Sequence, residues 1–192
     1  MRRIVFLAAV LFALPPASHA QILSVYGTFS PVHVSGVSNS GNAQNLSTAT
    51  FWAEGVGAGA TLNFLPIGPI KLGFDLRGST RQGGNGADLV LAGLRLGVKA
   101  PFFKVKPYIQ ASAGYFAPRP YLVNSPLPAG TVSNGKYVAY EILGGIDYPL
   151  IHFVDLRVIE IGGGQAYSTG TTGTSGNQPS LFTIGTGAVV HF

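Results

Sequence analysis

The sequence predicts an all-β fold, a closed up-and-down barrel of eight antiparallel strands that crosses a membrane. Three observations lead to this prediction. Apolar residues make up 46% of the 192 residues and charged residues only 10%, against about 25% charged in ordinary soluble domains. The chain also contains 27 glycines, and glycine disfavours long helices. Finally, segments of about ten residues carry apolar side chains at every second position, which is the period of a two-faced strand.

The beginning of the chain has the order of an export signal. Two arginines precede an apolar stretch over residues 4–14, and Ser18 and Ala20 supply the small-residue pattern of a cleavage site. We therefore expect residues 1–20 to be a signal peptide and residues 21–192 to form the barrel domain. No later apolar run approaches the roughly 18 residues of a membrane helix. The absence of cysteine excludes a disulfide scaffold and a thiolate metal site.

Eight segments after residue 20 show the alternation. The last is the clearest, because its even positions are mostly apolar while its odd positions are mostly glycine, threonine and histidine. Between the segments lie clusters of Gly, Ser, Asn, Thr and Pro, which are typical of turns and loops. The expected strands are residues 23–30, 51–64, 71–81, 88–99, 107–116, 138–148, 152–160 and 182–192.

The connections alternate between long and short, as expected for a barrel with short periplasmic turns and longer external loops. An even number of strands places both termini at the periplasmic end. The glycine runs at 83–86 and 162–164 are expected to be flexible loops rather than phosphate-binding loops, because no strand-to-helix context surrounds them. The long loops are expected at 31–50, 82–87, 117–136 and 162–179, and the short turns at 65–70, 100–106 and Pro149.

The two faces of the strands differ in a way that separates a membrane barrel from a soluble one. One face carries mainly Leu, Ile, Val, Phe and Tyr, whereas the other carries Gly, Ser and Thr together with charges of both signs. The second face is too small and polar to form an apolar core, so we expect the apolar face to contact lipid. Glu54 and Glu160 fall on the apolar face, which predicts either positions at the rim or a β-bulge that shifts the register.

Charged residues on the inward face form the main candidate site. An eight-stranded barrel is only wide enough for side chains to fill its interior, and buried ions without partners are costly. We therefore expect an internal salt-bridge plug, with Asp75–Arg95 as the first expected pair and Asp147–Arg157 as the second. A narrow pore is the alternative. The expected lumen charges are Lys71, Asp75, Arg77, Arg95, Lys99, Glu141, Asp147, Asp155 and Arg157.

The last strand resembles the C-terminal signal that the barrel-assembly machinery reads, because the aromatic Phe192 follows apolar Ala188 and Val190 at alternate positions. Three further segments are similar to the eight-stranded outer-membrane β-barrel family, the OmpA/OmpX-like barrels. The resemblance implies a place in the outer membrane of a Gram-negative bacterium, with lipid and the assembly machinery as partners. These segments are Leu94-Arg95-Leu96 leading into Pro101-Phe102, Lys106-Pro107-Tyr108-Ile109 and Gly144-Gly145-Ile146-Asp147-Tyr148.

The family contains structural anchors, adhesins, small channels and a few enzymes, so the resemblance leaves the function open. We expect no catalytic residue, cofactor or metal site, no nucleic-acid partner, and a monomer. His33 and Ser35 have the His-x-Ser spacing of lipid A deacylases but fall in an expected loop, and His152 and His191 are expected at the rim. The expected function is structural or surface interaction with a plugged lumen. A narrow small-solute channel is the alternative, followed by a soluble ligand-binding barrel and a lipid-modifying enzyme.

Overall fold

The computed structural model describes residues 23–38, 48–81, 86–99, 104–119, 137–168 and 178–192. Within these ranges there are β-strands but no helix, and hence no helix able to cross a membrane. The expected signal peptide and cleavage site lie outside the described residues. The strands are β1 (Leu23–Phe29), β2 (Val32–Ser38), β3 (Thr48–Ala53), β4 (Gly55–Ile67), β5 (Ile70–Arg81), β6 (Gly86–Val98), β7 (Lys106–Arg119), β8 (Tyr137–Ile151), β9 (Val154–Ser168) and β10 (Ser180–His191).

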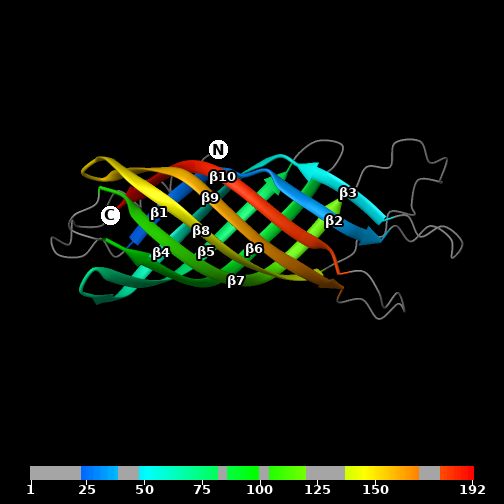
Figure 1. The fold of residues 1–192 in the computed structure, drawn as a ribbon, viewed down its shortest axis with the longest axis horizontal. Helices are drawn as coiled ribbons and strands as arrows, with labels where there is room; N and C mark the ends of the chain where they lie inside the picture. The colour runs from blue at the N-terminus through cyan, green and yellow to red at the C-terminus, as the bar shows by residue number, and fades with distance from the viewer. Residues whose placement is uncertain (1–22, 39–47, 82–85, 100–103, 120–136, 169–177) are drawn as a thin grey trace, which may run out of the picture.

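The ten segments form a closed antiparallel barrel of eight strands, which confirms the expected fold class. β1 and β2 follow each other along one strand that is interrupted at Ser30 and Pro31, and β3 and β4 follow each other across Glu54. Proline has no N–H to donate to a neighbouring strand, so an interruption at Pro31 is expected. The sheet closes because β10 pairs with both β1 and β2, and Figure 1 shows β10 lying beside them.

Several strands extend into segments expected to be loops. β2 and β3 pair with each other inside the expected loop 31–50, and β9 continues through the glycine run at 162–164 to Ser168. The prediction of a flexible loop at 162–164 was therefore wrong. The physical reason is close approach of the neighbouring strand, since a Cβ added at Gly164 would lie 2.0 Å from the Tyr140 carbonyl oxygen.

The faces point as expected, with apolar side chains outside and charged side chains inside. Leu94 and Ile142 are 53% and 54% exposed, whereas Asp75 and Arg157 are completely buried. A water-soluble barrel shows the opposite arrangement, because its apolar side chains fill the interior.

One part of the lumen is apolar, whereas the sequence predicts a polar interior. Near the end that carries β2 and β3, buried side chains from successive strands pack into a single cluster. Tyr137 belongs to this cluster and contacts Phe116, with ring centroids 6.1 Å apart. We call this cluster the apolar layer; its members are Val32, Val34, Ala53, Leu89, Leu91, Phe116, Tyr137, Ala139, Ala166 and Leu181.

Two tyrosines each lie across a glycine of the neighbouring strand. Tyr26 faces Gly59 and Tyr108 faces Gly145 in the strand register. A Cβ at Gly145 would lie 2.5 Å from the Tyr108 hydroxyl oxygen, and a Cβ at Gly59 would lie 2.3 Å from the Tyr26 ring. The missing side chains therefore leave the space in which both rings lie.

Replacing Gly145 by alanine should consequently displace Tyr108 and lower the free energy of unfolding by about 1–3 kcal/mol, as overpacking commonly does. The adjacent Gly144 is a matched control, because a Cβ there would be 3.5 Å from its nearest neighbour, an ordinary contact. Gly144→Ala should change stability by less than about 1 kcal/mol. Urea unfolding of both variants in detergent micelles measures the difference, and equal midpoints would contradict the packing argument.

Candidate functional site: the charged lumen

All nine charged residues expected on the inward face do lie inside the barrel or at its mouth, and they form two groups. The first group is buried at mid-barrel and is centred on Arg157. The second group lines an open pocket at the end of the lumen where β1 begins and β10 ends. The buried group contains Asp75, Arg77, Glu141 and Arg157, and the pocket contains Lys71, Arg95, Lys99, Asp147 and Asp155.

Arg157 links Asp147 of the pocket to the buried Glu160. Its Nε donates to Asp147 Oδ1 at 3.0 Å, and its Nη1 donates to Glu160 Oε2 at 3.1 Å. The guanidinium also lies 4.3 Å from the Tyr26 ring centroid and 4.9 Å from that of Tyr108. A cation between two aromatic faces gains from their negative potential, so the two tyrosines that cover Gly59 and Gly145 also hold this arginine.

Glu160 is part of this group, although its position in the sequence placed it on the apolar face. The pairing of β9 shifts register near Arg157 against both β8 and β10, so the alternation is reversed beyond this point. The bulge alternative is therefore correct for Glu160. Arg77 donates to both of its carboxylate oxygens at 3.0 Å, and the Tyr108 hydroxyl donates to it as well. Glu54 stays exposed between β3 and β4.

Asp75 does not pair with Arg95, so that expected pair was wrong. Its carboxylate accepts hydrogen bonds from Tyr26 at 2.8 Å, Thr61 at 2.7 Å and Gln110 at 2.7 Å. The nearest cation is Arg77, whose Nε lies 3.7 Å away. This carboxylate therefore accepts three short hydrogen bonds from neutral side chains.

Arg95 instead reaches Asp147, with Nη2 and Oδ2 2.6 Å apart, and its guanidinium carbon lies 3.6 Å from the Tyr108 ring centroid. Asp147 thus accepts from Arg95 and Arg157 together, and the expected Asp147–Arg157 pair is present. Arg95 lies on β6 and Asp147 on β8, so this contact crosses the lumen past β7. Side chains in a narrow barrel can reach strands that are not hydrogen-bonded neighbours.

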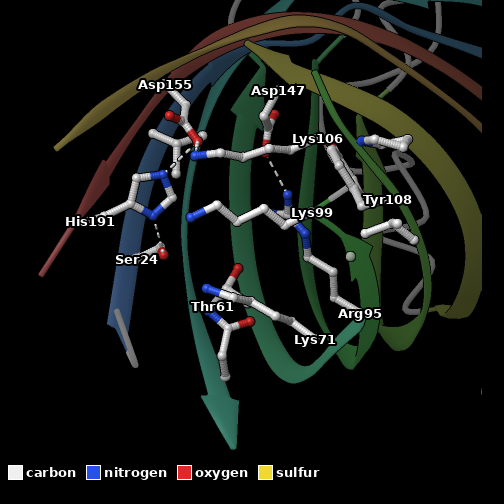
Figure 2. A pocket seen from close by; sticks show the side chains of 15 residues that line it. Ser24, Thr61, Lys71, Arg95, Lys99, Lys106, Tyr108, Asp147, Asp155 and His191 are labelled. Atoms are coloured by element: carbon white, nitrogen blue, oxygen red, sulfur yellow. Dashed lines mark hydrogen bonds and ion pairs between the residues drawn. The ribbon is translucent and has the colours of Figure 1, made fainter. Parts of the chain in front are cut away.

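The pocket at the mouth has a volume of about 70 Å³ and contains two residues not expected in the charged network (Figure 2). Lys106 Nζ donates to Asp155 at 2.6 Å, and His191 Nε2 lies 2.7 Å from the same oxygen. The other ring nitrogen of His191 lies 2.8 Å from Ser24 Oγ. Extending the expected strand 107–116 by one residue would have placed Lys106 on the inward face with Tyr108 and Gln110.

The histidines expected in loops or at the rim have different surroundings. His33 is in β2, where its ring centroid lies 5.0 Å from that of Trp52 on the outward face. Ser35 Oγ lies 2.6 Å from Ser180 Oγ. His152 lies at the rim as expected, in the turn at residues 152–153 between β8 and β9. The turn expected at Pro149 was wrong, because Pro149 belongs to β8 and pairs with Asp155. His191, by contrast, belongs to the pocket.

Neither a family model nor a curated protein matches the chain, but several solved outer-membrane barrels are similar to it. Neisserial surface protein A has 18% identity and a TM-score of 0.46, covering 88% of this chain and 97% of that one. The outer-membrane protein AlkL, solved in lipid bilayers, has 17% identity and a TM-score of 0.48, covering 93% and 95%. Ail of Yersinia pestis has 10% identity and a TM-score of 0.40, covering 88% and 99%. At these identities the likeness concerns the fold alone.

Proposed function

We propose that the protein is an integral outer-membrane β-barrel with a closed lumen, whose role is structural or is surface interaction. The observation that carries this proposal is the exposed apolar outer face combined with a buried, ion-paired interior. Contiguous apolar patches of more than a few hundred Å² are rare on soluble monomers. A closed barrel also satisfies the backbone groups of its strands without water, as hydrocarbon requires.

The proposed partners are membrane lipid around the outer face and the barrel-assembly machinery during insertion. Ala188 on β10 and Phe192 just after it are exposed, with the partly buried Val190 between them. The Phe192 backbone N–H donates to the Leu23 carbonyl oxygen at 2.9 Å, which joins the last residue to the start of β1 at the seam. Because β10 also pairs with β1 there, the proposed assembly signal is part of the closure. We propose a monomer, since this pairing leaves the closing strands no open edge.

Two successive barriers support a closed lumen. The apolar layer fills the barrel towards the end that carries β2 and β3, and the network of Arg157 fills the middle. An ion entering from the pocket would have to displace buried salt bridges and then cross apolar side chains. Each of these steps costs several kcal/mol.

The test combines gel mobility with electrical recording. We expect purified protein to migrate differently before and after boiling, to stay with membranes during carbonate washing, and to give no current steps in planar bilayers. Release by carbonate together with stability in detergent-free buffer would contradict the membrane proposal and favour a soluble ligand-binding barrel.

A narrow channel is the second candidate, and the open spaces inside the lumen favour it. Besides the pocket at the mouth, a cavity of about 20 Å³ lies beside Arg77, Ser79 and Glu141. Reproducible current steps whose ion selectivity changes in Arg77→Gln would support the channel and overturn the closed lumen.

We further propose that the barrel is not an enzyme. A catalytic histidine must lie within hydrogen-bond reach of the nucleophile it activates. Ser35 bonds to Ser180, and the ring of His33 packs against Trp52. These contacts favour a structural role for both residues.

A further inference from the structure

The mouth of the barrel carries more positive charge than its carboxylates can neutralise. Asp147 accepts from Arg95 and Arg157, and Asp155 accepts from Lys106 and contacts His191. Both carboxylates of the pocket are therefore already paired.

Lys71 and Lys99 are the two remaining cations that line the pocket. Within the described ranges, neither ammonium group has a carboxylate oxygen within 4 Å. Figure 2 shows both side chains extending into the pocket in the same direction as Lys106, towards the wall that carries Ser24 and His191. The pocket thus holds two cations that point the same way and have no acidic partner within 4 Å.

The shape of the pocket indicates where a ligand would come from. Its lining residues come from β1 and from every strand from β4 to β10, so the wall surrounds the pocket on all sides. The opening therefore lies along the barrel axis and faces the aqueous compartment rather than the lipid. A volume of about 70 Å³ suits a small ion.

We propose that Lys71 and Lys99 form a binding site for a small phosphate-class oxyanion that enters from the aqueous side. A phosphate group carries roughly −1.5 to −2 charges at neutral pH, which balances two ammonium groups, whereas a monocarboxylate would balance only one. Lysine binds phosphate as a point charge and needs no fixed planar geometry. The source is free phosphate or a small soluble phosphate monoester. This site is additional to the proposed function of the barrel.

Titration calorimetry on the full mature chain in an uncharged maltoside detergent tests the proposal. We expect saturable binding of inorganic phosphate, with acetate at equal ionic strength at least about tenfold weaker. The double variant Lys71→Gln/Lys99→Gln should bind phosphate at least about tenfold more weakly than the unchanged protein.

Lys104→Gln is the matched control, because Lys104 is an exposed lysine at the same end that does not line the pocket. It should bind phosphate like the unchanged protein. Gel mobility before boiling shows separately whether each variant is folded, and Lys99→Gln alone replaces the double variant if that fails to fold. Glycerol phosphate distinguishes the two sources: equal binding extends the site to monoesters, and weaker binding restricts it to free phosphate. Absent phosphate binding, phosphate binding that the lysine variants retain, or acetate binding of equal strength would overturn the proposal.

Discussion

Replacing Arg157 by methionine should lower the free energy of unfolding by about 3–5 kcal/mol, the typical cost of breaking a buried ion pair from one side. Methionine fills part of the space but leaves Asp147 and Glu160 each without one cationic partner. It also removes the cation that lies between the rings of Tyr26 and Tyr108. Urea unfolding in detergent micelles, followed by the fluorescence of the single tryptophan, Trp52, measures the loss.

Arg95→Met is the appropriate control for this variant. Arg95 is also an inward arginine bonded to Asp147, but its side chain is 12% exposed and lines the open pocket. Water can therefore partly solvate the Asp147 carboxylate that this substitution leaves with one cationic partner fewer. We expect the loss in the free energy of unfolding to be roughly half that of Arg157→Met. The double variant Arg157→Met/Asp147→Asn should lose less than the sum of the two single variants, because the buried carboxylate is removed with its partner. Strict additivity, or an equal loss in Arg95→Met, would contradict a network centred on Arg157.

The architecture could be predicted from the sequence because a strand with two different faces has an unmistakable period of two. The number of strands follows from this period, and the outward direction of Leu94 and Ile142 follows from the different chemistry of the two faces. Strand ends were predicted less well. The segments around Val34 and Gly163 contain many small residues, which are typical of loops, yet pairing with β3 and β8 keeps them extended.

The site was partly predictable for a similar reason. The alternation of side chains between the two faces of each strand predicts that nine charged residues point inward. A single bulge near Arg157, however, is enough to move Glu160 from the outer face to the centre of the network. No local sequence pattern predicts that bulge. The pairing of charges is harder still to predict from the sequence. Arg95 bonds to Asp147 across the lumen and not to a residue on an adjacent strand. The shear of the barrel decides such contacts, and it is a property of the whole sheet.

The apolar layer shows how inward apolar residues can be missed. Leu89 and Leu91 lie within a nearly continuous apolar run, in which the outward Val90 separates them, so the two faces look alike there. Val32 and Val34 fell in a segment expected to be a loop. The sequence therefore predicts a more uniformly polar inward face than the structure has.

The outer face gives a test that separates a membrane barrel from a soluble one by a single pair of substitutions. Leu94 lies near the middle of β6 and is 53% exposed, while Phe153 lies in the turn between β8 and β9 and is 55% exposed. Arginine at either position would be equally accessible to water if the barrel were soluble. In that case both substitutions should change stability by no more than about 0.5 kcal/mol, as surface substitutions usually do.

In a membrane the two substitutions should differ in how much they lower the free energy of unfolding. Leu94→Arg places a charge near the bilayer midplane and should cost about 2–4 kcal/mol, whereas Phe153→Arg near the interface should cost about 0–1 kcal/mol. Ser112→Arg is a poor comparison, because Ser112 is buried and accepts a hydrogen bond from Gln110 at 2.9 Å, so a larger side chain would clash. Urea unfolding of barrels folded into lipid vesicles provides the measurement. A large loss for Leu94→Arg alone requires lipid at mid-barrel, and equal small losses for both variants would mean that this outer face is in contact with water.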